Sequence, residues 1–265
     1  MAMEEATIKQ CCATFYGSDL ALKLLGDSFH PGGVRLTQRL GELLNLAPEM
    51  HVLDVASGRG TSALHLAKSF GCRVTGIDLS EANIAAARDA ADAEGIGECL
   101  DFALADAEHL PFNDASFDAI VCECAFCTFP GKDMATTEFA RVLKNGGAVG
   151  ISDLTRTPAP LPELQDLLAW IACIGDALPM QEYASILTHG GLTVEHMEAQ
   201  NDALAEMVRG VQSRLLGLEI ASGLGKLDIP GLDLSTAKRF AAAAAEAIRS
   251  GKLGYAILVA RSRTQ

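Results

Sequence analysis

Short apolar segments alternate with longer helix-like segments from His51 onward, and this alternation limits the folds open to the chain. Strands that alternate with helices form βαβ units and a mostly parallel sheet. We predict strands over His51–Ala56, Arg73–Ile77, Leu100–Ala105, Phe117–Cys122, Ala148–Ser152, Leu192–Met197 and Gly254–Ala260. We predict helices over Thr61–Phe70, Glu81–Glu94, Asp133–Leu143, Met180–His189, Ala203–Ile220 and Ser235–Arg249.

The pattern predicts a single α/β domain with a Rossmann-like, seven-stranded, mostly parallel sheet and helices on both faces. A chain of 265 residues is long enough for one sizeable core and short for two. We assign residues 1–50 to an N-terminal helical lid segment, and residues 51–199 and 252–265 to the α/β core. Residues 200–251 form a helical insertion before the last strand, through which an oligomer could form.

The formal net charge of −13 opposes binding to nucleic acid, because an acidic surface repels phosphate backbones. The longest apolar runs are too short for a membrane span, and the first residues lack the order of a signal peptide. We therefore expect a cytoplasmic protein with a small-molecule or metalloid substrate, and with neither nucleic acid nor membrane as a partner.

A strand, a turn of small residues and a helix start follow one another in Val52–Thr61. Small residues let the backbone approach a ligand, and the helix start offers free N–H groups. The alternative is a tight turn that binds nothing. The dinucleotide pattern Gly-x-Gly-x-x-Gly does not fit, because Ala56 and Ala63 replace its first and third glycines. An acid, Asp78, closes the second predicted strand, where a carboxylate can accept both ribose hydroxyls of an adenosine.

Further phrases follow in order: Ala105–Glu108, Leu110–Phe112, Phe117–Ile120 and Arg141–Gly147. With Asp54-x-x-x-Gly58-x-Gly60 they resemble the class I S-adenosylmethionine (SAM)-dependent methyltransferases over about residues 50–155. The resemblance implies SAM as the cofactor, an antiparallel last strand, the ribose on Asp78, and the adenine flanked by Asp106 and Ala107. The implied cofactor-binding residues are Asp54, Ala56, Gly58, Gly60, Asp78, Leu79, Asp106 and Ala107.

Eight cysteines are many for a chain in a reducing compartment, and three of them lie close together in the sequence. We interpret Cys72 and Cys99 as packing residues, because free cysteine is often buried. The cluster of Cys122, Cys124 and Cys127 stands where the fourth strand ends, which should face the reactive end of the cofactor. If that strand extends far enough, Cys122 and Cys124 share one face. A zinc site made of this cluster and Cys173 is an alternative.

A narrower resemblance, over about residues 120–195, is to arsenite methyltransferases. That family has a cysteine at the position of Cys124 and another in a phrase that stands here as Cys173–Leu178. An upstream cysteine precedes a Tyr-Gly pair, as Cys12 precedes Tyr16 here. The resemblance implies trivalent arsenic as the substrate, held by Cys124 and Cys173, with Cys12 as a further catalytic thiol. The third thiol stays open among Cys122, Cys127, Cys11 and Cys12.

The chemistry agrees with this residue type, because arsenic is thiophilic and methyl transfer depends mainly on positioning of the reactants. We expect the sulfur atoms of Cys124 and Cys173 to face one cavity beside the SAM methyl group. Two alternatives stay open: a methyltransferase of a small organic acceptor, and a non-catalytic thiol-based binder or sensor of metalloid. His30, in a loop, is more often a surface or capping group than a catalyst.

Overall fold

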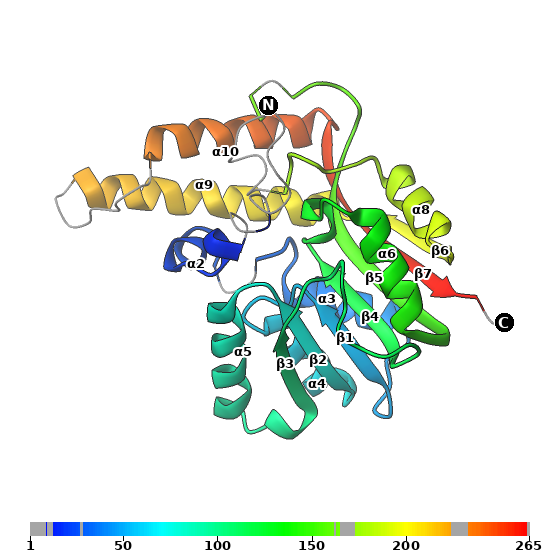
Figure 1. Cartoon of the computed structure of the whole chain (residues 1–265). Coiled ribbons are helices and arrows are strands. Elements are labelled where there is room, and N and C mark those ends of the chain that lie inside the picture. The colour runs from blue at the N-terminus through cyan, green and yellow to red at the C-terminus, as the bar shows by residue number, and fades with distance from the viewer. Residues whose placement is uncertain are drawn as a thin grey trace.

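The protein folds around a seven-stranded sheet with helices packed against it, as the computed structural model in Figure 1 shows. The structure describes residues 9, 13–26, 29–161, 163–164, 173–223 and 233–263. The strand order is β3-β2-β1-β4-β5-β7-β6. The strands are β1 (His51–Val55), β2 (Arg73–Asp78), β3 (Leu100–Leu104), β4 (Phe117–Glu123), β5 (Leu143–Arg156), β6 (Leu192–Ala199) and β7 (Leu253–Ser262).

All pairings among β1 to β5 are parallel, whereas β7 runs antiparallel to both β5 and β6. The predicted Rossmann-like sheet is therefore confirmed, including the reversed last strand. Most residues of its central strands are buried, as expected for a sheet that helices cover on both faces.

The strand order reverses between β1 and β4, which pair directly through Val55 and Cys122 near their carboxyl ends. Because the chain leaves β1 toward β2 and reaches β5 from β4, the connections on the two sides diverge and leave a crevice there. This crevice is where a doubly wound sheet binds its ligand, and it places the residues after β1 and after β4 opposite one another.

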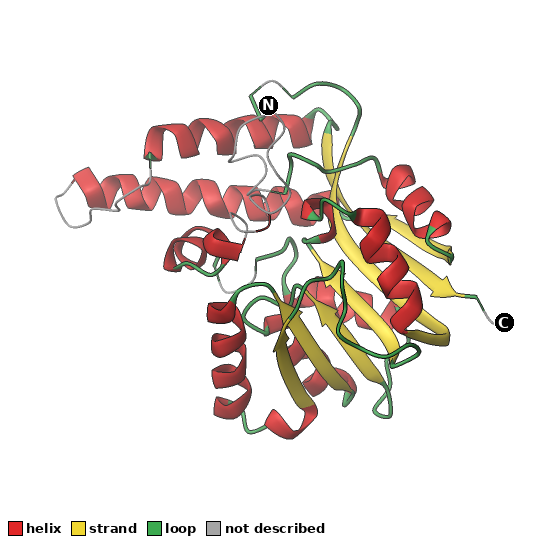
Figure 2. Cartoon of the chain, in the orientation of Figure 1, coloured by secondary structure: helices red, strands yellow, loops and turns green. Residues whose placement is uncertain are grey.

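Helices cover both faces of the sheet, as Figure 2 shows in red over the yellow strands. α3 packs on α4 on one side, and α6 packs on α8 on the other. α5 begins at Glu81, behind the Ser80 side chain that accepts a hydrogen bond from the Asn83 N–H. The helices of the core are α3 (Val34–Leu43), α4 (Thr61–Phe70), α5 (Glu81–Ala93), α6 (Lys132–Val142) and α8 (Met180–His189), with short 3₁₀ turns η1 (Gly97–Cys99) and η2 (Phe126–Thr128).

Two long helices, α9 (Asn201–Gly223) and α10 (Leu234–Arg249), separate β6 from β7 in the chain. They lie side by side, and α9 also contacts β7 and the short N-terminal helix α2 (Asp19–Leu25). Figure 1 shows all three helices on the same side of the molecule, beyond one end of the sheet. Among the residues that the structure describes, no helix combines the length and apolar character needed to cross a bilayer.

The ends of the strands differ from the predictions, and two of these differences affect the argument. β5 begins at Leu143, directly after α6, and its pairing with β4 shifts in register between Phe117 and Ala119. β4 ends at Glu123, and Cys124 has a φ of 53°, which takes the chain out of the sheet. Cys122 and Cys124 therefore do not share a strand face, and Cys122 is fully buried in the core. The sequence also predicts a helix through Trp170, and that residue lies outside the described part of the chain.

Candidate active site

The turn after β1 brings backbone to the edge of the crevice. Ala56, Gly58 and Gly60 all have positive φ, of 57°, 54° and 83°. At Gly60 an added Cβ would come within 3.0 Å of the Ala87 Cβ, so only glycine lets α4 pack at this point. A cavity opens at this crevice. Ala56 and Gly58 line it, whereas Gly60 does not. The structure thus places Gly60 in the packing of the turn.

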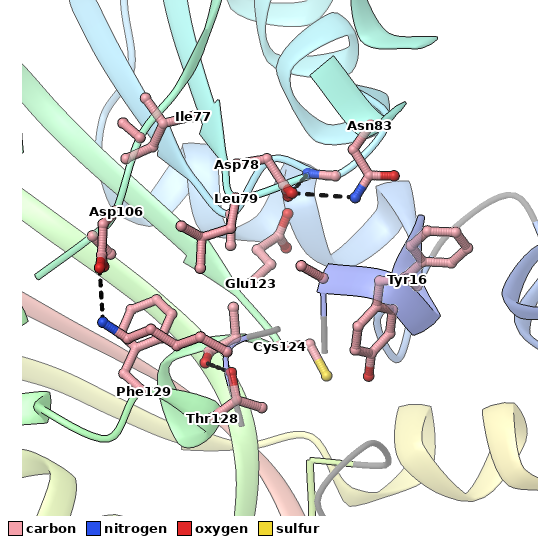
Figure 3. A pocket seen from close by; sticks show the side chains of 18 residues that line it. Tyr16, Ile77, Asp78, Leu79, Asn83, Asp106, Glu123, Cys124, Thr128 and Phe129 are labelled. Atoms are coloured by element: carbon pink, nitrogen blue, oxygen red, sulfur yellow. Dashed lines mark hydrogen bonds and ion pairs between the residues drawn. The ribbon is translucent and has the colours of Figure 1, made fainter. Parts of the chain in front are cut away.

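Asp78 lies at the end of β2 and lines the same cavity. Its carboxylate accepts hydrogen bonds from the N–H of Gly58 (2.9 Å) and Ser80 (2.8 Å), and from the Asn83 side-chain amide (3.2 Å). Figure 3 shows this carboxylate pointing to Asn83 at the cavity wall. Burial raises the pKa of Asp78, and the three donors oppose that shift. The carboxylate is thus oriented before any ligand arrives.

Three buried polar atoms of this region have no hydrogen-bond partner within the described residues: Asp54 Oδ2, Ser57 Oγ and Asn83 Oδ1. Buried acceptors without a partner are costly, so their presence together at one crevice indicates a ligand that bonds to them. Asn83 lies beside Asp78, where ribose hydroxyls would bind. Asp54 and Ser57 line a side cavity at the other end of the turn, where the ammonium of the methionine part would fit. The residues present therefore fit SAM.

Asp106 and Ala107 follow β3 and line the cavity at the end away from Cys124. The Lys9 ammonium pairs with Asp106 at 2.8 Å and with Glu108 at 2.6 Å. Glu108 also accepts a hydrogen bond from the Gly131 N–H at 2.9 Å. The N-terminal segment is thus attached to the cavity rim at this end, and the sequence motifs gave no indication of it.

Glu123, the last residue of β4, is buried and lines both the main cavity and the side cavity. It accepts hydrogen bonds from the hydroxyls of Ser62 (2.6 Å) and Thr37 (3.0 Å). His30 Nε2 lies 3.7 Å from the same carboxylate oxygen and 3.4 Å from Ser62 Oγ. The surface or capping role expected for His30 is therefore wrong, because its ring is 8% exposed within this network.

Three thiols meet where β4 and β5 end. The sulfur of Cys173 lies 3.4 Å from the Cys124 carbonyl oxygen and 3.4 Å from the Tyr16 hydroxyl, and the thiols of Cys124 and Cys127 are close enough to shift its pKa. Cys124 lines the cavity, and Figure 3 shows its sulfur turned toward Tyr16. Cys122 takes no part in this cluster. Cys11 and Cys12 lie outside the described residues.

The cluster changes the acidity of its members. Hydrogen bonds from Cys124 and Cys127 lower the pKa of the Cys173 thiol well below its usual value. The same contact with Cys173, together with burial, raises the pKa of Cys124. Burial raises the pKa of Cys127, and that of the neighbouring Asp153 carboxyl to about 7. Within this group the negative charge is therefore best placed on Cys173.

The two cysteines that we interpreted as packing residues differ in their burial. Cys72 is fully buried, as a packing role requires, but Cys99 is exposed and the packing interpretation is wrong for it. In the part of the chain that the structure describes, no three His, Cys, Asp or Glu side chains are arranged to hold a metal ion. The zinc alternative therefore has no ligand set there.

The comparisons with known proteins agree with this geometry. Residues 52–147 match the family model described as "Methyltransferase domain". The methyltransferase GfsG of Streptomyces halstedii is 38% identical over 128 residues, which are 48% of this chain and 46% of that protein. The chain thus spans about half the length of this relative. The 27-O-demethylrifamycin SV methyltransferase of Amycolatopsis mediterranei (strain S699) is 28% identical, over 92% of this chain and 93% of that protein.

Residues 52–147 therefore form a methyltransferase domain, and the chain is similar to SAM-dependent methyltransferases on both sides of it. A solved structure of geranyl diphosphate C-methyltransferase from Streptomyces coelicolor A3(2), in complex with S-adenosyl-L-homocysteine, has the same fold, with a TM-score of 0.74 and 16% identity over 96% of this chain and 97% of that chain. SAM is the cofactor of this methyltransferase, and the roles of its individual binding residues stay predictions.

The site contains residues that the motifs did not reveal. Tyr16, Lys9, Glu123 and Asn83 all line the cavity. Glu123 stands inside the cysteine phrase, and its place at the end of β4 was a usable signal. Tyr16 and Lys9 come from a segment far away in sequence, and no local pattern places them at the crevice.

Proposed function

We propose that this protein transfers the methyl group of SAM to a small organic acceptor bound between the N-terminal segment and the end of β4. The observation that carries the proposal is a cavity whose lining differs from one side to the other. One end presents the oriented carboxylate of Asp78 and the backbone of the β1 turn. The other presents Tyr16, Cys124 and Phe129.

SAM supplies an electrophilic methyl group when bound. The work left to the protein is to hold donor and acceptor in line and to exclude water, which contributes most of the rate in such displacements. Asp78 and Asn83 would hold the ribose, and Asp54 with Ser57 the methionine end. Tyr16 and Phe29, whose ring centroids lie 5.8 Å apart, would cover the acceptor.

The charge of the cavity limits the acceptor. Asp78, Asp106 and Glu123 line it, and the cation Lys9 is already paired with Asp106 and Glu108. An acceptor with a carboxylate or phosphate would meet repulsion from Glu123 without a compensating base among the described lining residues. We therefore favour a neutral or cationic acceptor with an apolar body.

The names of the relatives support an organic acceptor but do not decide its charge. The name of the Amycolatopsis relative specifies 27-O-demethylrifamycin SV, and another relative, from Halorhodospira halochloris, is a sarcosine/dimethylglycine N-methyltransferase. Both names describe organic acceptors. We extend to this chain only the acceptor class and neither compound.

Arsenite is the second candidate, and one observation favours it: Cys173 contacts both Cys124 and Cys127 beside the cavity. Trivalent arsenic binds such thiols strongly. Against this, Cys127 and Cys173 are 1% and 2% exposed, so the thiols would have to rearrange to surround a substrate. For this reason we rank the organic acceptor first.

A panel assay of SAM turnover tests both candidates. Purified protein is incubated with SAM and with phenols, alcohols, amines, a carboxylate or arsenite plus thiol reductant, and S-adenosylhomocysteine is quantified. We expect turnover with a neutral or cationic organic acceptor that persists in Cys173→Ser. Turnover of arsenite alone, lost in Cys124→Ser and Cys173→Ser, would instead establish the metalloid function. SAM binding without turnover of any acceptor would contradict both.

A further inference from the structure

The thiols of Cys124 and Cys173 are close enough for each to shift the pKa of the other, although 49 positions separate the two residues in the sequence. The Cys173 sulfur also lies 3.4 Å from the Cys124 carbonyl oxygen, so it sits over the backbone of the turn that follows β4. Methyl transfer to an organic acceptor uses neither thiol. The contact therefore needs another explanation.

Both cysteines have a backbone conformation that side chains seldom adopt. Their φ angles are 53° for Cys124 and 61° for Cys173, in the left-handed region that favours glycine. Such residues persist only where the surroundings hold them, and they concentrate at functional sites.

Contacts on both segments supply this hold. The Cys124 N–H donates to the Ser152 carbonyl at 2.7 Å. The segment of Cys173 is held by Asp176, which pairs with the buried ammonium of Lys132. Lys132 also donates to the Phe129 carbonyl at 3.0 Å, which ties the Cys173 segment to the turn after β4. The two sulfurs are thus kept together by backbone and ion-pair contacts.

The two thiols differ in access. Cys124 is half-buried and lines the cavity, whereas Cys173 is 2% exposed behind it. Cys127 also contacts Cys173, but it is 1% exposed and its N–H is bound to Asp153 at 2.8 Å. A small oxidant that enters the cavity reaches Cys124 first and finds Cys173 directly behind it.

We propose that Cys124 and Cys173 form a reversible disulfide when a peroxide enters the cavity, and that this bond closes the acceptor end. The Cys124 thiol passes its proton to the Cys173 thiolate, and the Cys124 sulfur attacks the peroxide. The O–O bond breaks, a sulfenic acid forms on Cys124, and the leaving hydroxide takes the proton from Cys173 and departs as water. The Cys173 thiolate then attacks the Cys124 sulfur. The S–S bond forms as the S–O bond breaks, and the leaving hydroxide departs as water with a proton from solvent. Peroxide is reduced and the two thiols are oxidised.

The modification acts on one end of the cavity only. The new bond fixes the turn after β4 to the Cys173 segment and removes the thiol that contacts the Tyr16 hydroxyl. Asp78 and the β1 turn lie at the other end and take no part. The oxidised protein therefore keeps its SAM affinity and loses methyl transfer, until a thiol reductant restores it.

Peptide mapping of the peroxide-treated full-length protein tests the proposal without any knowledge of the acceptor. Free thiols are alkylated, the protein is digested without reductant, and crosslinked peptides are identified by mass spectrometry. We expect a Cys124–Cys173 pair that dithiothreitol removes and that is absent from Cys124→Ser and Cys173→Ser, or from the corresponding Ala variants if a Ser variant does not fold. The matched control is Cys99→Ser, which alters an exposed thiol away from the cavity and should leave the pair intact.

Three results would overturn the proposal: a Cys127–Cys173 pair, over-oxidation of Cys124 without a crosslink, or no reaction at either thiol at peroxide concentrations that oxidise Cys99. Calorimetry of the crosslinked protein with SAM adds a second reading, and a loss of SAM affinity would contradict closure of the acceptor end alone. Because the mapping involves no turnover, its result is independent of whether the proposed methyltransferase function holds.

Discussion

The two ends of the cavity are built in different ways. At the cofactor end, each group follows directly from a strand: the turn after β1, Asp78 at the end of β2 and Asp106 after β3. At the acceptor end, Tyr16, Cys124 and Cys173 come from three segments that lie far apart in the sequence. The turns that directly follow the strands form the first end, whereas contacts between remote segments hold the second.

The difference indicates a division of labour. One fold can keep its cofactor end constant and vary the acceptor end, because the contacts that define the acceptor lie outside the sheet. It follows that changes at the two ends should separate cleanly into effects on SAM affinity and effects on everything else.

The largest change in SAM affinity is expected from Asp78→Ala, at the cofactor end. Loss of a buried acceptor for ribose hydroxyls should weaken SAM binding by on the order of 100-fold, about 3 kcal/mol. Calorimetric titration with SAM measures this. Asp101→Ala, at an exposed carboxylate on the adjacent strand, is the control and should bind normally. Unchanged affinity in Asp78→Ala would remove Asp78 from the ribose site.

At the acceptor end, Asp153 should affect the free energy of unfolding and leave SAM affinity unchanged. Burial raises the pKa of its carboxyl to about 7. Between about pH 4 and pH 7 the folded chain therefore binds a proton that the unfolded chain has released, so the stability contribution falls as pH rises. From pH 5 to pH 7 this amounts to about 2 kcal/mol.

Urea unfolding at several pH values measures this contribution. In Asp153→Asn, the free energy of unfolding should fall less between pH 5 and pH 7, whereas Asp101→Asn should leave this fall unchanged. An equally steep decline in Asp153→Asn would assign the pH dependence to other groups.

Glu123 stands between the two ends, and Glu123→Gln sharpens the comparison. Its carboxylate lines both cavities, so removal of the charge should weaken binding of cationic SAM by about tenfold. The amide can still accept from Ser62 and Thr37, which should preserve the fold. The loss should shrink at high salt, and a salt-independent loss would indicate a shape effect.

The smallest effect is expected for Cys124→Ser and Cys173→Ser. Because both thiols belong to the acceptor end, SAM affinity should stay within about twofold of the unchanged protein, below 0.5 kcal/mol. The same calorimetric titration applies. A tenfold loss in either variant would mean that the thiols support the cofactor and that the two ends are not separate.

Much of the cofactor end was predictable from local sequence. Strand, turn and helix signals stand side by side in Val52–Thr61, and Asp78 follows at strand spacing, so short-range rules suffice. The seven-stranded, mostly parallel sheet and the antiparallel β7 were likewise expected. β4 was correctly placed, but the φ of 53° that turns Cys124 away from Cys122 has no signal in the residue type.

Contacts between remote segments were harder to foresee. The contact of Cys173 with Cys124 was expected only through a family resemblance. The positions of Tyr16 and Lys9 depend on how the N-terminal segment packs over the crevice, and that packing is decided by tertiary contacts. His30 was misjudged for the same reason: a loop in the sequence became a buried wall beside Glu123.

A crystal structure with S-adenosylhomocysteine tests the central claim most directly, because it shows which way the cofactor lies between the two ends. We predict that the ribose hydroxyls bind Asp78, with the adenine near Asp106 and Ala107, and that the thioether sulfur faces Cys124 and Tyr16. A ligand with its sulfur directed away from that pair, or bound outside the cavity lined by Asp78, would contradict the account.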